Sequence, residues 1–165
     1  MVMKIARFGH IGSERPAVMV NQTQAVYVDH LIKDWNRDEL VAGALDKVKS
    51  ADLSSLAPFD IAGLRIGSPV ARPTKLICIG LNYADHAAET GAAIPAEPII
   101  FNKWITAMCG PDDDVEIPRG SVKTDWEVEL GVVIGTGGKY IDEAEAMDHV
   151  AGFCVINDIS EREYQ

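Results

Sequence analysis

The chain has 165 residues, 47% of them hydrophobic and 24% charged, which is enough apolar material for a packed core. Its formal net charge of −10 argues against binding to nucleic acid or to an anionic membrane, because phosphate groups attract basic surfaces. Three widely spaced cysteines without a Cys-x-x-Cys pair indicate neither a disulfide framework nor a zinc site. We therefore expect a cytoplasmic protein with reduced thiols, no signal peptide, no membrane span and a small-molecule partner.

The N-terminal part predicts a small β-meander. Apolar residues over 4–8, 16–20 and 25–28 predict three strands, with a turn at 21–24 between the last two. Helix formers over 37–49 place an apolar stripe on one face and predict one helix that covers the meander. The stripe consists of Leu40, Val41, Ala44, Leu45 and Val48. Two prolines within residues 67–73 mark a connection, so we expect one domain of residues 1–70 and a second of residues 71–165.

The second part alternates strand and helix patterns. A buried strand is expected over residues 76–80, then a helix around His86 and a strand over 99–101. Further strands are expected over 127–134 and 153–157, with a helix over 142–149 between them. Residues 111–118 are expected to form a solvated loop, because their acidic run lacks the spacing of a calcium-binding loop.

Carboxylates gather in two of these segments. Glu127 and Glu129 share one face of their strand, whereas Trp126 and the apolar residues at 128, 130, 132 and 134 share the other. Asp158 ends the next strand and adds a third carboxylate if the two strands are close. Oxygen donors without clustered Cys or His favour Mg²⁺ or Mn²⁺, with Ca²⁺ as a further option, over Zn²⁺. The alternative interpretation is a half-buried strand whose wet face carries two glutamates.

A histidine and a glutamate form a second candidate site. His86 and Glu89 are three residues apart ahead of a glycine stop at Gly91, so a helix would bring them to one face. Glu89 could then orient the His86 ring and raise its basicity, as a general base requires. The alternative is a solvent-exposed pair on a helix surface.

Six short motifs follow one another in the second part of the chain. They are Cys-x-Gly-x-Asn-Tyr-x-x-His-x-x-Glu at 78–89, Pro-Ile-Ile-Phe-Asn-Lys at 98–103, Gly-Pro-Asp-Asp at 110–113, Ile-Pro at 117–118, Asp-Trp-Glu-Val-Glu-Leu at 125–130 and Asn-Asp-Ile-Ser-Glu-Arg-Glu-Tyr-Gln at 157–165. In order and spacing over residues 75–165, these motifs resemble the fumarylacetoacetate hydrolase family. The resemblance implies an α+β, β-rich fold, in which the N-terminal meander with its helix precedes a mixed β-sandwich or β-roll. It also implies a homodimer.

The resemblance also implies roles for individual residues. Glu127, Glu129 and Asp158 would bind the metal ion, and His86 with Glu89 would activate a water molecule. Gln165 would contact the substrate, and Lys103 would face it.

The implied activity is that of a divalent-metal-dependent hydrolase. It would cleave a carbon–carbon bond in a β-diketo acid, such as an acylpyruvate or a 2,4-dioxo sugar acid, through a metal-bound enolate. Decarboxylation, isomerisation or lyase chemistry on an oxoacid remains an alternative within the family, and a catalytically silent metal-binding fragment is another. Family members continue for roughly a hundred further residues, about a small domain. The resemblance therefore implies that the second domain is truncated on its C-terminal side, where a lysine usually holds the substrate's oxyanion.

Overall fold

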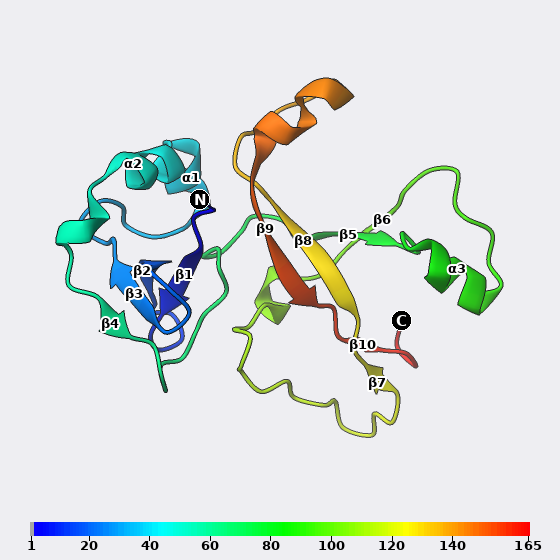
Figure 1. The fold of residues 1–165 in the computed structure, drawn as a ribbon. Coiled ribbons are helices and arrows are strands. Elements are labelled where there is room, and N and C mark those ends of the chain that lie inside the picture. Colours follow the sequence, from blue (N-terminus) through cyan, green and yellow to red (C-terminus); the bar gives the residue numbers. More distant parts are fainter. Residues whose placement is uncertain (1) are drawn as a thin grey trace. The chain divides into compact units, whose positions relative to one another are not determined.

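Short strands dominate the secondary structure of residues 2–165, the part that the computed structural model describes (Figure 1). Several small sheets and a few short helices confirm the expected β-rich α+β class. The chain forms two compact units, one of residues up to Ala71 together with Cys109–Gln165, and the other of Arg72–Met108. The division into domains of residues 1–70 and 71–165 stays a prediction.

The N-terminal meander is confirmed and has one strand more than expected. Its antiparallel strands are β1 (Ile5–Phe8), β2 (Arg15–Met19), β3 (Gln24–Tyr27) and β4 (Phe59–Asp60), in the order β1-β2-β3-β4. The Asn21 side-chain oxygen closes the expected turn by accepting the backbone N–H groups of Thr23 and Gln24 at 2.8 and 2.9 Å. β4 was not predicted because two residues are too few to show an alternating pattern.

The single helix expected over 37–49 is wrong. The structure has α1 (Arg37–Val41) and α2 (Ala44–Ser50), followed by the 3₁₀ helix η1 (Leu53–Ser55). Gly43 separates α1 from α2 with a φ of +84°, a left-handed conformation that glycine adopts at little cost. The break turns Val41 toward solvent, whereas Ala44 and Val48 of the expected stripe are buried.

The best-formed core lies between this sheet and these helices. Its buried members are Val18, Val26, Val28, Ile32, Trp35, Ala44 and Val48. Trp35 is fully buried and its indole N–H donates to the carbonyl oxygen of Ala17 at 3.2 Å, which satisfies the one polar atom of the ring. The N-terminal sheet and its helices thus share one hydrophobic core.

A network of partly buried ion pairs joins the N-terminal sheet to the loop after Met108. Arg7 donates to Asp34 and Glu14, and Glu14 also accepts from Arg65 at 2.8 Å. Arg65 in turn donates to both carboxylate oxygens of Asp113. The solvated loop expected over 111–118 is confirmed, except that Asp113 is partly buried against Arg65. The contact could not be predicted, because Arg65 is 48 positions away in the sequence.

The unit that contains residues 109–165 is completed by a long hairpin and a short strand pair. Its elements are β7 (Thr124–Asp125), β8 (Val128–Ile134), the 3₁₀ helix η3 (Glu143–His149), β9 (Val150–Asn157) and β10 (Ser160–Glu161). β8 pairs with β9 and β7 with β10, both antiparallel. The expected strands are thus present, but the expected helix over 142–149 is a 3₁₀ helix.

One face of the β8–β9 hairpin is apolar and exposed. Leu130 lies opposite Val155, and Val132 lies opposite Phe153. Leu130 is 60% exposed and Val155 is 80% exposed. The alternating sequence pattern predicted the apolar face of β8 correctly, but this face is exposed in this chain.

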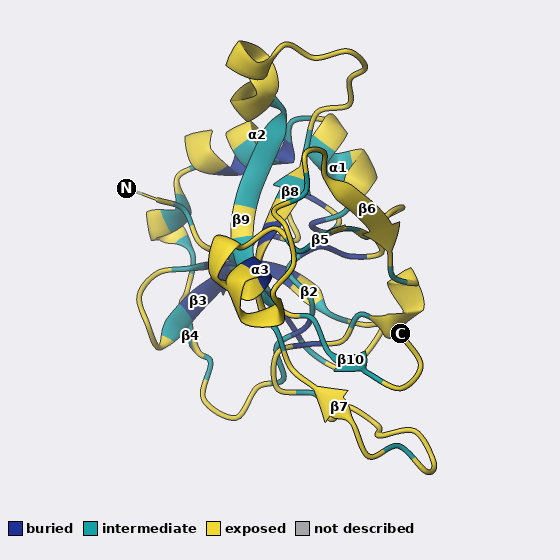
Figure 2. Cartoon of the chain, turned by 90° about the vertical axis from the view of Figure 1, so that its right-hand side faces the viewer, coloured by how far each residue is buried: buried dark blue, intermediate teal, exposed yellow. Residues whose placement is uncertain are grey.

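The unit Arg72–Met108 is a hairpin with one helix. It comprises β5 (Ile77–Gly80), α3 (Ala84–Thr90), β6 (Ile99–Asn102) and the 3₁₀ helix η2 (Ile105–Ala107). The expected burial of the strand over 76–80 is wrong, since Ile77 is 60% exposed and β6 is exposed along its length (Figure 2). Within residues 2–165, no helix has the length and apolar character that crossing a membrane requires.

Candidate functional site

The backbone brings the three predicted metal-binding positions to one end of the β8–β9 hairpin. The N–H of Asp158 donates to the carbonyl oxygen of Glu127 at 2.8 Å. The N–H of Glu127 donates to the side-chain oxygen of Asn157 at 3.3 Å, and Glu129 lies opposite Ile156 in the ladder. The antiparallel pairing of β8 with β9 therefore brings Glu127, Glu129 and Asp158 to the same end of the hairpin.

One of the three carboxylates at this end, that of Glu127, contacts a cation. A carboxylate oxygen of Glu127 lies 2.5 Å from Nη2 of Arg162, and both side chains are partly buried. Among residues 2–165, no three His, Cys, Asp or Glu side chains gather closely enough to hold a metal ion. The ligand assignment of Glu127, Glu129 and Asp158 therefore stays a prediction, supported by the backbone but not by side-chain convergence.

Arg162 contacts three side chains at this end, those of Asp125, Glu127 and Gln165. Its Nε and Nη2 donate to one oxygen of Asp125 at 3.1 and 2.8 Å, and its Nη1 donates to Oε1 of Gln165 at 3.1 Å. The hydrogen bond from Arg162 is the main cause that holds the pKa of Asp125 below its ordinary value. Reciprocally, the hydrogen bonds to Asp125 and Glu127 raise the pKa of Arg162, so the guanidinium stays charged.

The position of Arg162 is fixed by the β7–β10 pair. Ser160 lies opposite Asp125, and the N–H of Arg162 donates to the carbonyl oxygen of Lys123 at 3.0 Å. Lys123 itself pairs with Glu163 at 3.1 Å on the surface. Sequence reasoning missed Arg162, although it is the one cation in the acidic segment 158–165.

His86 and Glu89 lie on α3, as expected, and both are exposed. The N–H of His86 donates to Asp85, and its carbonyl oxygen accepts from the hydroxyl of Thr90 at 3.0 Å. Across the described residues, no hydrogen bond or ion pair joins the side chains of His86 and Glu89. Their cooperation as a general base stays a prediction that rests on their shared helix.

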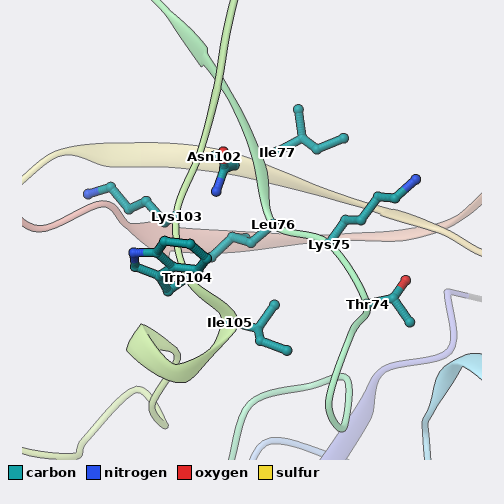
Figure 3. Close-up of a pocket in the computed structure, with 8 residues that line it drawn as sticks. All are labelled: Thr74, Lys75, Leu76, Ile77, Asn102, Lys103, Trp104 and Ile105. Atoms are coloured by element: carbon teal, nitrogen blue, oxygen red, sulfur yellow. The ribbon is translucent and has the colours of Figure 1, made fainter.

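Lys103 lines a shallow concavity of about 440 Å³ within the unit Arg72–Met108 (Figure 3). The lining residues are Thr74, Lys75, Leu76, Ile77, Asn102, Lys103, Trp104 and Ile105. Figure 3 shows the amino groups of Lys75 and Lys103 pointing in opposite directions. The concavity is therefore an apolar surface with basic groups at its sides, and the role of Lys103 toward a substrate stays a prediction.

A family comparison identifies the chain. The family described as fumarylacetoacetate (FAA) hydrolase, C-terminal, matches residues 75–165. This chain belongs to the fumarylacetoacetate hydrolase family.

Relatives extend the match to almost the whole chain. A protein from Burkholderia ambifaria, provisionally named a hydrolase, is 50% identical over 163 residues, which are 99% of this chain and 57% of the relative. The chain thus spans somewhat more than half the length of the curated relatives it matches.

Solved structures share the fold. A fumarylacetoacetate hydrolase from Exiguobacterium antarcticum has a TM-score of 0.80 at 28% identity, over 99% of this chain and 58% of its own. A Mycobacterium abscessus protein assigned as a 2-hydroxyhepta-2,4-diene-1,7-dioate isomerase has a TM-score of 0.75 at 28% identity, over 98% and 54%. A maleylpyruvate hydrolase from Sphingobium, solved with manganese(II) and pyruvate, has a TM-score of 0.76 at 24% identity, over 98% and 60%. Neighbours of this fold thus include hydrolases and an isomerase, and one of them binds a divalent metal.

Proposed function

We propose that this chain carries the divalent-metal site of a hydrolase that cleaves a carbon–carbon bond in a β-diketo acid. Mg²⁺ or Mn²⁺ is the proposed ion, and a small oxoacid is the proposed partner. The observation that carries the proposal is the backbone arrangement of Glu127, Glu129 and Asp158 at one end of the β8–β9 hairpin. The contact between Glu127 and Arg162 supports it further, because this end of the hairpin already accommodates a cationic group.

The donor set fits a hard divalent ion. Three carboxylates supply oxygen ligands and three negative charges, so a divalent ion would leave a local charge near −1 and open coordination positions for substrate oxygens. When bound, such an ion acts as a Lewis acid toward the substrate carbonyls, an effect worth several kcal/mol. The chain's contribution is to hold the ligands on a paired hairpin rather than on a mobile loop.

The remaining site residues have separate proposed roles. His86 would accept the proton of the attacking water, and Glu89 on the same helix face would stabilise the charged ring. Gln165 accepts from Arg162 through Oε1, which orients its side-chain N–H groups to donate to a substrate oxygen. Lys103 would attract the substrate carboxylate.

A second candidate function stays within the same site. Decarboxylation or tautomerisation of a 2-oxo acid requires the same charge stabilisation, and the Mycobacterium abscessus neighbour is assigned as an isomerase. Product analysis distinguishes these reactions: hydrolysis of an acylpyruvate releases pyruvate and a second acid, whereas oxaloacetate decarboxylation releases carbon dioxide. An isomerase would change the absorbance of its substrate without releasing either product.

Metal binding is the first test. Free Mn²⁺ measured by electron paramagnetic resonance should fall when the chain is added, and Glu129→Gln should weaken this binding at least tenfold. Glu143→Gln on η3 is the matched control, because it removes the same charge from an exposed position outside the hairpin end. Equal Mn²⁺ affinity in wild type and Glu129→Gln would reject the proposed ligand set.

Turnover then separates the base from the metal ligands. In the full-length enzyme, His86→Ala should lower kcat by roughly 10²–10⁴ with little change in Mn²⁺ affinity, because a general base is not a ligand. Glu89→Gln should cost less, and Asp158→Asn should be partly rescued by added Mg²⁺ or Mn²⁺. Full hydrolase activity in His86→Ala would remove the histidine from the mechanism.

A further inference from the structure

The Arg162 guanidinium contacts two carboxylates that have different proposed roles. Asp125 accepts two of its N–H groups through one oxygen, at 3.1 and 2.8 Å, while Glu127 lies 2.5 Å from Nη2. Glu127 is a proposed metal ligand, and Asp125 is not. A third N–H group of the same side chain holds Gln165, the proposed substrate contact.

A divalent ion and Arg162 would compete for Glu127. Both cations bind carboxylate oxygens directly and at short distance. A carboxylate that is hydrogen-bonded to a guanidinium is therefore a weaker metal ligand. A guanidinium has several donors in a rigid fork, so it can leave one acceptor and keep others. Asp125 and Gln165 are the acceptors that would keep Arg162 in place.

We propose that Arg162 is a positioning residue that occupies Glu127, yields this carboxylate to the incoming metal ion and stays anchored on Asp125 and Gln165. The proposal rests on the proposed function, since it takes Glu127 as a metal ligand. It deepens that function by coupling the metal-binding end of the hairpin to the substrate-contacting Gln165 through one side chain. Arg162 then tunes the affinity for the metal without being a ligand.

A neighbouring ion pair provides matched controls. Lys123 and Glu163 pair at 3.1 Å in the segments that also contain Asp125 and Arg162. Among residues 2–165, no hydrogen bond or ion pair joins either of them to Glu127. Lys123→Met removes a positive charge, as Arg162→Met does, from the same part of the chain. Glu163→Gln removes a negative charge, as Asp125→Asn does. Differences between each variant and its control therefore report the direct contact rather than the general field.

The experiment is Mn²⁺ titration of the purified 165-residue chain by electron paramagnetic resonance, with thermal unfolding of every variant. Arg162→Met should bind Mn²⁺ about threefold to tenfold more tightly than Lys123→Met, because the competitor for Glu127 is gone. Asp125→Asn should bind more weakly than Glu163→Gln, because Arg162 then has Glu127 as its one remaining carboxylate partner and holds it more strongly. Arg162→Lys should return the affinity toward wild type. If Arg162→Met does not fold, the comparison of Asp125→Asn with Glu163→Gln tests the same competition, and equal Mn²⁺ affinity of these two variants overturns the proposal.

The outcomes separate this proposal from the proposed function. If wild type binds Mn²⁺ and Arg162→Met matches Lys123→Met, the competition is absent and the positioning role is overturned. If Arg162→Met binds more weakly than Lys123→Met, Arg162 organises the site instead of yielding it, which also overturns the proposal. Failure of wild type itself to bind Mn²⁺ overturns the metal site and this proposal together.

Discussion

Asp113 accepts two hydrogen bonds from Arg65, each 2.6 Å long, through both of its carboxylate oxygens. One of these oxygens also accepts the backbone N–H of Gly110, and Arg65 extends the network to Glu14. The paired fork is the strongest geometry available to an arginine and a carboxylate. This contact ties the loop after Met108 to the end of the N-terminal sheet.

We predict that Arg65→Met lowers the melting temperature by roughly 5 °C at neutral pH, because it leaves Asp113 and Glu14 without their shared cation. Differential scanning calorimetry measures the change. Arg37→Met is the control, since Arg37 pairs with the adjacent, exposed Asp38 and its loss should shift the melting temperature little. Equal shifts in the two variants would show that the network contributes no more than a surface pair.

The same network predicts a pH dependence. The hydrogen bond from Arg65 holds the pKa of Asp113 below its ordinary value in the folded chain. The stability from this pair is therefore complete above the unfolded-state pKa, about 3.9, and is lost as the pH falls through the lower folded-state pKa. The difference in melting temperature between wild type and Arg65→Met should be constant from about pH 8 to 5 and shrink below about pH 4. A difference that grows on acidification would contradict the assignment.

Gly110→Ala should destabilise the same junction. A Cβ atom at Gly110 would overlap the carbonyl oxygen of Ile66, and backbone cannot yield as a flexible side chain can. We expect a loss of about 1–3 kcal/mol in the free energy of unfolding, measured by urea denaturation. Gly137→Ala is the matched control, because a Cβ there meets no atom within 4 Å. A neutral Gly110→Ala would mean that the loop does not pack closely on Ile66.

Trp35→Ala should cost about 3–5 kcal/mol of folding free energy, because it removes a fully buried ring and its bond to the Ala17 carbonyl. Trp104→Ala is the control, with 79% of its side chain exposed. Fluorescence should separate them as well, since acrylamide reaches Trp104 and not Trp35. Similar unfolding midpoints in urea for the two variants would be incompatible with the core described above.

Leu130→Thr should leave the unfolding midpoint nearly unchanged while reducing the binding of an apolar fluorescent dye. The side chain belongs to the exposed apolar face of β8, so its removal loses little buried area and shrinks an exposed patch. Val133→Thr is the comparison, because Val133 lies on the other, partly buried face. Dye binding by Leu130→Thr equal to that of wild type would mean that this face is covered in solution.

The sequence alone determined the local features of this protein. Period-two alternation identified β8 and its apolar face, and turn residues identified the meander around Asn21. The order of motifs over residues 75–165 was enough to identify the family. These properties depend on neighbours within a few positions, which is the range over which strand and turn geometry acts.

Only the tertiary structure decided which distant groups meet. Arg162 reaches Asp125 across 37 positions, and Arg65 reaches Asp113 across 48 positions, distances at which no periodic pattern carries information. The left-handed Gly43 split an expected helix, and the apolar faces of β5 and β8 proved exposed, because burial depends on what packs against a strand rather than on its own pattern. Glu127 lies beside Arg162 because the β7–β10 pairing brings that cation to the hairpin end, and the pattern of residues around Glu127 does not encode this pairing.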